Sequence, residues 1–165
     1  KTAESVDSPV SIVAEVVAYN KARKLEMSKR VISAFSGDVK GRRLSVLGLA
    51  FKPETDDMRE SPAIELIKEL MVEGAVITAY DPVAMDEARQ IFTEHIHYED
   101  SAQACLNGAD GAIVVTEWNE FRALTPQLFA DLMTGNILVD LRNVYEPEQM
   151  KAFGLNYRSI GRPEA

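Results

Sequence analysis

A charged segment of eleven residues, 51–61, carries the side chains best suited to chemistry in this sequence. Lys52 and Arg59 supply two cations, Phe51 supplies an aromatic face, and four carboxylates surround them. Lysine binds phosphate as a point charge and arginine binds it as a planar fork, so this mixture favours an anionic ligand. The segment is also longer than the roughly two to six residues usual between a strand and a helix, and long loops are often functional.

A buried strand precedes this segment and a helix follows it. The apolar run at residues 44–50 is typical of a strand covered on both faces in a parallel sheet. Ser61 is a helix-capping residue type, Pro62 suits the first helical turn, and apolar residues then recur at helical spacing. These flanks predict a strand, a loop and a helix, and the charges of the loop either bind a ligand or pair with one another in solvent.

A dinucleotide site is a rival interpretation of the same unit. Asp81 ends the second predicted strand, where an acidic residue can hold an adenosine ribose. After Gly48, however, the second and third glycines that let a backbone approach a pyrophosphate are absent. The missing glycines weaken this interpretation.

Strands and helices alternate along the whole chain. A long helix is expected between the capping pair Ser8 and Pro9 and the stop at Gly37. Six strands are then predicted at residues 44–50, 76–80, 96–98, 112–116, 137–141 and 156–160. This alternation predicts an α/β fold with a doubly wound parallel sheet of about six strands in the order 3-2-1-4-5-6. We expect two parts, the helix at 1–37 and the sheet domain at 38–165.

That strand order also predicts where a ligand lies. In doubly wound sheets, ligands bind beyond the carboxyl ends of the strands, where the order reverses. Lys52 follows the first strand, Glu117 and Trp118 follow the fourth, and Arg142 follows the fifth. We expect Lys52 and Arg142 to bind phosphate there, with Phe51 or Trp118 covering a base or a sugar.

The composition argues against several classes of protein. A formal charge of -8 on 165 residues argues against sequence-independent nucleic-acid binding. No stretch reads as a signal peptide or a membrane span, and the single Cys105 favours a reducing compartment, which we take to be the cytoplasm. We expect Cys105 to be a core residue, and His95 and His97 to be exposed residues of an edge strand rather than metal ligands.

The predicted long helix has two different halves. Residues 10–19 are apolar on all sides, whereas the following residues leave only a stripe of Ala22, Leu25, Ile32 and Phe35. An ordinary core helix is possible, but a surface this apolar favours a connecting or subunit-interface helix and a homodimer.

One long motif and four shorter ones carry a resemblance to a known family. G-L-A-F-K-P-E-T-D-D-M-R-E-S-P, at residues 48–62, resembles a signature of the UDP-glucose/GDP-mannose dehydrogenase family. Four shorter motifs are similar to motifs of that family in order and spacing. They are A-Y-D-P at 79–82, T-E-W at 116–118, V-D-L-R-N at 139–143 and S-I-G-R-P at 159–163. The resemblance covers essentially the whole chain. It implies the central helix and the carboxyl-terminal Rossmann-like domain of such an enzyme, without its amino-terminal part.

The resemblance also implies an activity and site residues. Family members use NAD to oxidise the 6-hydroxyl of a nucleotide sugar, as from UDP-glucose to UDP-glucuronate with two NAD consumed, in polysaccharide-precursor synthesis. Phe51, Lys52 and Arg142 match positions that bind the UDP-sugar, and Arg59 matches an arginine that reaches the NAD. The family's nucleophilic cysteine lies in a segment that this chain does not match. Cys105 therefore inherits no catalytic role, and we expect the chain alone to be inactive.

Three alternatives stay open. A related UDP-N-acetylmannosamine or GDP-mannose dehydrogenase would share these motifs. A phosphoacceptor receiver module is also doubly wound and has an acidic pair such as Asp56 and Asp57, but it needs a lysine where Arg142 ends the fifth strand. A non-catalytic binding or dimerisation module would not respond to nucleotides.

Overall fold

A single parallel sheet forms the centre of the molecule. The computed structural model describes residues 11–162, with side chains from residue 15 onward apart from residue 21. The six strands lie in the order β3-β2-β1-β4-β5-β6, which confirms the predicted topology. They are β1 (Arg43–Leu47), β2 (Val76–Tyr80), β3 (His97–Tyr98), β4 (Gly111–Val114), β5 (Ile137–Asp140) and β6 (Asn156–Ser159).

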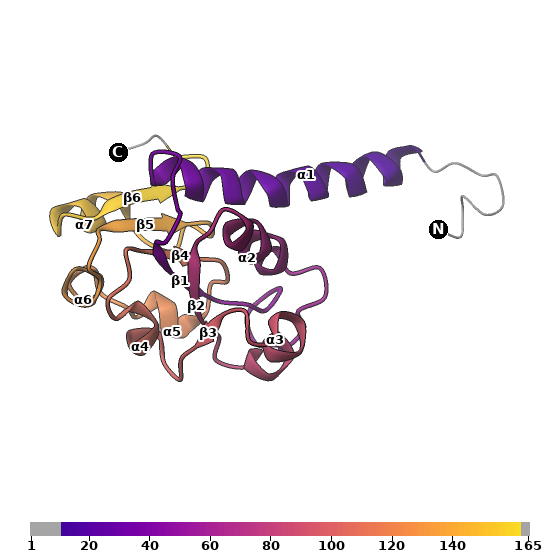
Figure 1. Cartoon of the computed structure of the whole chain (residues 1–165). Coiled ribbons are helices and arrows are strands. Elements are labelled where there is room, and N and C mark those ends of the chain that lie inside the picture. Colours follow the sequence, from indigo (N-terminus) through magenta and orange to yellow (C-terminus); the bar gives the residue numbers. More distant parts are fainter. Residues whose placement is uncertain (1–10, 163–165) are drawn as a thin grey trace.

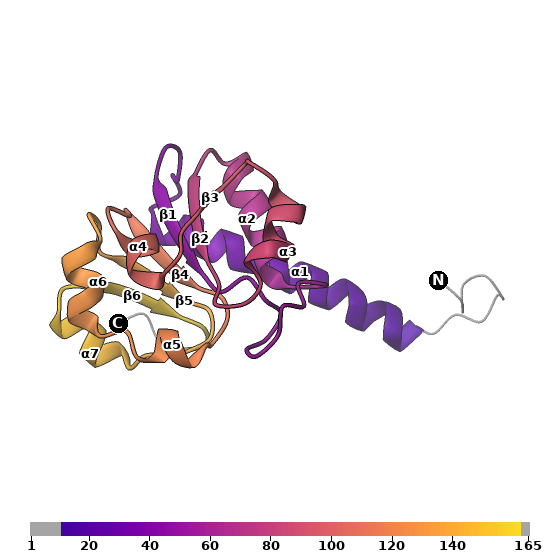
Figure 2. The same ribbon diagram turned by 90° about the horizontal axis from the view of Figure 1, so that it is seen from below.

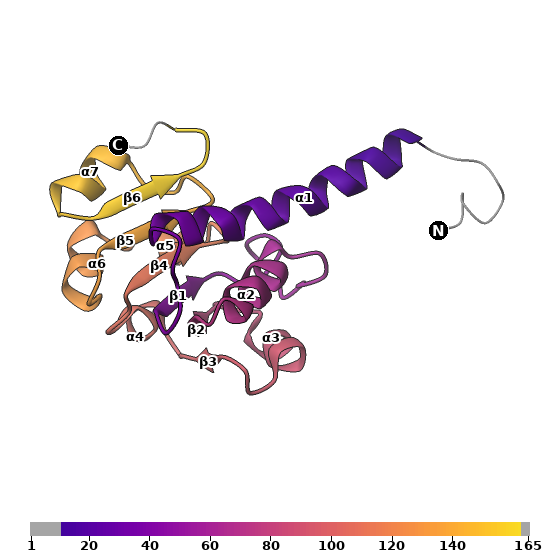
Figure 3. The ribbon, with the colours of Figure 1, turned by 45° about the horizontal axis from the view of Figure 1, so that its top comes forward.

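Helices cover both faces of this sheet. Among the described residues they are α1 (Ser11–Ala34), α2 (Pro62–Val72), α3 (Met85–Phe92), α4 (Ala102–Leu106), α5 (Asn119–Arg122), α6 (Pro126–Leu132) and α7 (Pro147–Ala152). The helices α1, α2 and α3 lie on one face, and α4, α6 and α7 lie on the other (Figure 1, Figure 3). The short α5 and the loop between β1 and α2 lie at the carboxyl edge of the sheet (Figure 2). No described helix combines the length and the apolarity needed to cross a membrane.

The central strand β1 is buried on both faces, as its apolar run predicted. Leu44, Val46 and Leu47 are all inaccessible to solvent. Beyond β1 the chain turns sharply at Gly48, whose φ is +94°, and a Cβ there would lie only 2.6 Å from the Cβ of Thr116. A side chain is therefore excluded, because the segments that leave β1 and β4 pass in direct contact.

The helix α1 packs on the domain only through its carboxyl-terminal half. Its end at Ala34, followed by a turn through Gly37 at φ +89°, agrees with the predicted stop, whereas the Ser8–Pro9 cap lies outside the described residues. The expected stripe was partly wrong: Ala22 is exposed, and Val31 is the fully buried apolar residue. The reason is geometric, since the amino-terminal half projects beyond the sheet and its covering helices (Figure 1).

Smaller differences concern the ends of elements. The helix expected from Val83 begins at Met85, and the strand expected from Ile96 begins at His97. The four-residue α5 was not predicted, because it has no capping side chain and is too short to show a periodic pattern. None of these differences moves a loop away from the carboxyl edge.

Candidate functional site

The loop between β1 and α2 has a fixed shape although it contains no regular structure. The Thr116 hydroxyl donates to the Ala50 carbonyl at 2.7 Å, and the Phe51 N–H donates to the Asp57 carbonyl at 2.9 Å. Met58 is buried and anchors the middle of the loop in the core. The loop therefore presents its first residues from a defined position at the end of β1.

Phe51 and Lys52 occupy that position with their side chains open to solvent. Phe51 is one of the few large apolar side chains that is exposed, at 51%. Lys52 is also exposed, and within residues 11–162 its ammonium group forms no hydrogen bond or ion pair. The exposed ring and the exposed cation beside it are both available to a ligand.

Arg142 lies at the same edge but is already paired. Strand register aligns Leu47 of β1 with Val114 of β4, and Val114 with Asp140 of β5, so the loops that follow these strands start side by side. Arg142 donates through Nε and Nη2 to the two carboxylate oxygens of Glu117. The sequence placed both residues at this edge but did not predict that they pair.

The contact between Glu117 and Arg142 affects the pKa of Glu117 and orients the guanidinium group of Arg142. Burial is the largest single influence on Glu117 and raises its pKa, but the hydrogen bonds from Arg142, a backbone hydrogen bond and the positive charges of Arg142 and Arg122 together lower the pKa below its usual value. Arginine has five N–H donors in one plane, of which this contact uses two along one side. The parallel N–H groups of Nη1 and Nη2 at the end of the guanidinium group stay available for a second anion.

Arg59 is held at the other end of the loop. Its Nε and Nη2 donate to the two oxygens of Asp57, each at 2.9 Å. This hydrogen-bonded pair lowers the pKa of Asp57 to about 2. The neighbouring Glu60 accepts from Lys24 of α1 at 2.7 Å, so the long helix also contacts this part of the loop. Arg59 thus projects from the helix-proximal end, and Lys52 projects from the strand-proximal end.

The expectation that Trp118 covers a ligand is wrong. Trp118 is only 4% exposed, and its Nε1 donates to Asp81 at 3.1 Å. Asp81 itself is 1% exposed and has no open acceptor for a ribose. In addition to Trp118, it accepts from the backbone N–H groups of Leu49, Ala50, Val83 and Ala84. Asp81 therefore joins the loops after β1 and β2, which also argues against the dinucleotide interpretation.

Asp140 fixes the loop that carries Arg142 in a similar way. One of its oxygens accepts from the Arg142 N–H at 2.9 Å. The other accepts from the N–H groups of Val144 and Tyr145 and from the hydroxyl of Tyr157. Sequence analysis considered Asp81 only as a ribose ligand and gave Asp140 no role, although each ends a strand and is followed by a turn, which is a signal for this structural role.

Cys105 is a core residue as expected, whereas of the two histidines only His97 lies in the edge strand β3 and His95 precedes it. Cys105 is buried, and burial raises the pKa of its thiol to about 12, so it stays protonated at neutral pH. His95 and His97 are exposed at the end of the sheet. Within the described part of the chain, no three His, Cys, Asp or Glu side chains gather as a metal site.

Comparison with known proteins shows close relatives among enzymes that act on nucleotide sugars. The model of the UDP-glucose/GDP-mannose dehydrogenase family, UDP binding domain, matches residues 45–147. A UDP-glucose 6-dehydrogenase of Rhizobium meliloti (strain 1021) is 44% identical over 164 residues, which make up 99% of this chain and 37% of that protein.

Solved structures of nucleotide-sugar dehydrogenases are also similar to this chain. A UDP-glucose dehydrogenase from Pyrobaculum islandicum has a TM-score of 0.74 at 29% identity, over 95% of this chain and 34% of that one. A GDP-mannose dehydrogenase from Pseudomonas aeruginosa has a TM-score of 0.71, over 96% of this chain and 36% of that one, and its 20% identity shows the shared fold alone. The chain thus spans about a third of the length of these relatives.

Proposed function

Because the chain belongs to the UDP-glucose/GDP-mannose dehydrogenase family and matches its UDP-binding domain, we propose that it binds the UDP part of a nucleotide sugar. The site is the carboxyl edge of the sheet, where Phe51, Lys52 and Arg142 lie on adjacent loops. The observation that carries this proposal is the orientation of Arg142, whose contact with Glu117 leaves the end of its guanidinium group open.

Each group has a separate role in this proposal. The free end of Arg142 donates two parallel hydrogen bonds to one phosphate of the ligand, and Lys52 neutralises the other as a point charge. Phe51 packs its exposed ring against the sugar or the base. The acidic charge of the whole chain does not oppose this, because the two cations are local and Lys52 forms no ion pair with any described residue.

The complete reaction belongs to a longer protein. We propose that the chain is the UDP-binding part of an NAD-dependent UDP-glucose 6-dehydrogenase, in which Arg59 faces the NAD. Cys105 is the one cysteine of the sequence, and its buried, protonated thiol is not available as a nucleophile for the reaction. The chain alone therefore binds the nucleotide sugar without oxidising it. Its location in the cytoplasm and its lack of nucleic-acid binding stay predictions.

The long helix supports a second part of the proposal, a homodimer. Val16, Val17 and Tyr19 are 52%, 63% and 64% exposed on the half of α1 that projects from the domain. Three large apolar side chains within one turn of a projecting helix favour burial by another copy of the chain. Asn20 is also exposed there, and nothing in the structure explains it.

Titration calorimetry with UDP tests the nucleotide site. Removing a charged hydrogen-bond partner costs roughly 1.5 to 3 kcal/mol, so we expect Arg142→Ala to weaken UDP binding by about ten- to a hundredfold. Arg142→Lys recovers only part of this loss, since it keeps the charge without the fork. Arg89→Ala, an exposed arginine of α3, is the control and leaves the affinity unchanged.

Three outcomes separate the alternatives. If UDP binds but Lys52→Ala and Arg142→Ala change nothing, the site lies elsewhere. If no nucleotide binds, the chain is a dimerisation module. If GDP binds more tightly than UDP, the base assignment is wrong and a GDP-sugar enzyme is the better proposal.

A further inference from the structure

A groove rich in arginine lies between α1 and the segment that follows β6. It has a volume of about 300 Å³ and is lined by Arg23, Glu26, Met27, Arg30, Ile160 and Gly161. None of the residues of the proposed nucleotide site lines it. The groove includes part of the S-I-G-R-P motif, which the proposed function leaves without a role.

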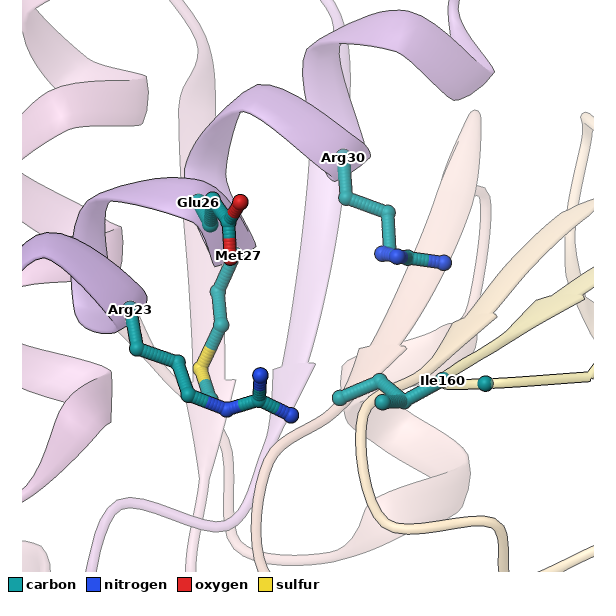
Figure 4. Close-up of a pocket in the computed structure, with 6 residues that line it drawn as sticks. Arg23, Glu26, Met27, Arg30 and Ile160 are labelled. Atoms are coloured by element: carbon teal, nitrogen blue, oxygen red, sulfur yellow. The ribbon is translucent and has the colours of Figure 1, made fainter. Parts of the chain in front are cut away.

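Two guanidinium groups flank an apolar floor in this groove. Arg23 and Arg30 are seven residues apart, or two helical turns, so they share one face of α1 with about 10 Å between their backbones. Met27 lies between them, and Figure 4 shows Arg23, Met27 and Arg30 extending from α1 towards Ile160. The groove therefore offers positive charge at its sides and apolar surface at its centre.

The two arginines keep most of their donors open. Arg30 uses Nη1 to donate to the Ser159 carbonyl at 2.9 Å, which leaves its other N–H groups. Arg23 forms no hydrogen bond or ion pair with any residue in the range 11–162. Glu26 is the one carboxylate among the lining residues, and it pairs with neither arginine in that part of the chain. Two arginines against one glutamate leave a net positive charge among the lining residues, which is a local attraction for anions in a protein of charge -8.

Further arginines lie near Arg30, and the segment opposite α1 is fixed. A smaller adjoining cavity of about 50 Å³ is lined in part by Arg30, Arg158 and Arg162. The side chain of Asn143 donates to the Ile160 carbonyl and accepts from the Ile160 N–H, both at 3.0 Å. The segment that closes the groove is therefore held in place before any ligand arrives.

We propose that this groove is a second anion site, which binds a small phosphate-bearing molecule between Arg23 and Arg30. Each guanidinium group donates bidentate hydrogen bonds to phosphate oxygens, and Met27 and Ile160 contact the carbon part of the ligand. The volume suits a small molecule, since it is at the lower end of the range of ligand pockets, roughly 300 to 1,000 Å³. Neither Lys52 nor Arg142 lines this groove, so it is a different site from the proposed UDP site.

Titration calorimetry with inorganic pyrophosphate at fixed ionic strength tests this site. The protein carries Lys52→Ala and Arg142→Ala throughout, so that binding at the nucleotide site does not contribute. We expect saturable binding to one site, weakened by about tenfold or more in Arg23→Gln. Lys29→Gln is the matched control, because it removes one charge from an exposed position of the same helix outside the groove, and it changes the affinity less than about twofold.

A loss of binding in Arg23→Gln can be attributed to the groove and not to unfolding. In the described part of the chain, the Arg23 side chain forms no hydrogen bond or ion pair that the substitution would remove. Arg30→Gln also removes the hydrogen bond to Ser159, so its folding is checked by circular dichroism. The proposal is overturned if pyrophosphate shows no saturable binding, or if Arg23→Gln and Lys29→Gln weaken it equally. An acidic hexapeptide that binds more tightly than pyrophosphate would overturn the assignment to a small molecule.

Discussion

Asp140→Asn should destabilise the protein strongly, because Asp140 is fully buried and accepts four hydrogen bonds. Asparagine has one carbonyl oxygen, which can replace the oxygen that accepts three of these bonds. Its amide group then faces the N–H of Arg142, so that two donors meet and one bond is lost.

The expected loss of stability in Asp140→Asn can be estimated from these four hydrogen bonds. A buried donor without a partner costs about 1 to 3 kcal/mol, and the three remaining bonds lose the support of a charged acceptor. We expect a total loss of about 2 to 4 kcal/mol in the free energy of unfolding, a large part of the roughly 5 to 15 kcal/mol typical of a domain. In urea, this moves the unfolding midpoint down by about 1 to 2 M.

Urea unfolding followed by circular dichroism measures this loss. Asp38→Asn is the matched control, since Asp38 is exposed and accepts one backbone N–H, that of Lys40 at 2.9 Å. We expect the control to stay within about 0.5 kcal/mol of the wild type. If Asp140→Asn unfolds at the same urea concentration as this control, Asp140 does not hold the Arg142 loop and our reasoning about this position is wrong.

Three further predictions follow from other groups. The carboxyl carbon of Asp57 should titrate by NMR with a pKa of about 2 and return towards 3.8 in Arg59→Ala. The contribution of this pair to stability is therefore full above about pH 3.8 and is lost as the pH falls from there through about 2. A wild-type pKa near 3.8 would show that the pair does not form in solution. The Cys105 thiol should react with a disulfide reagent at pH 8 only when urea unfolds the protein, because it is buried with a pKa of about 12, and fast labelling of the folded protein would contradict this. Val17→Glu should convert a dimer into monomers in light scattering, with Glu15→Gln as the control on the same helix, and a wild-type monomer at micromolar concentration would refute the dimer.

The sequence was sufficient to predict the sheet, because strand periodicity and the handedness of crossovers leave few topologies. The predicted meeting of the loops after β1, β4 and β5 then followed from the strand order, which the structure confirms. The contacts within those loops were not predictable in the same way. Trp118 and Asp81 are far apart in the sequence, and they meet where the loops after β2 and β4 both contact the loop after β1.

The same limit applies to the charged residues. A pattern of types and spacings shows that Lys52, Glu117 and Arg142 share an edge, but it does not show which carboxylate pairs with which cation. Side-chain pairing depends on distances of a few ångströms, set by turns that have no periodic signal. For α1, the pattern could not show which residues face the domain, since this depends on where the helix crosses the sheet.

Binding of UDP at the edge formed by Phe51, Lys52 and Arg142 is the central claim, and an NMR titration of the isotope-labelled chain with UDP tests it most directly. We expect saturable shifts of the backbone signals of these three residues with one common affinity, and unchanged signals for His95 and His97 at the far strand. Saturable shifts gathered at any other surface, or no shifts at millimolar UDP, would contradict the claim.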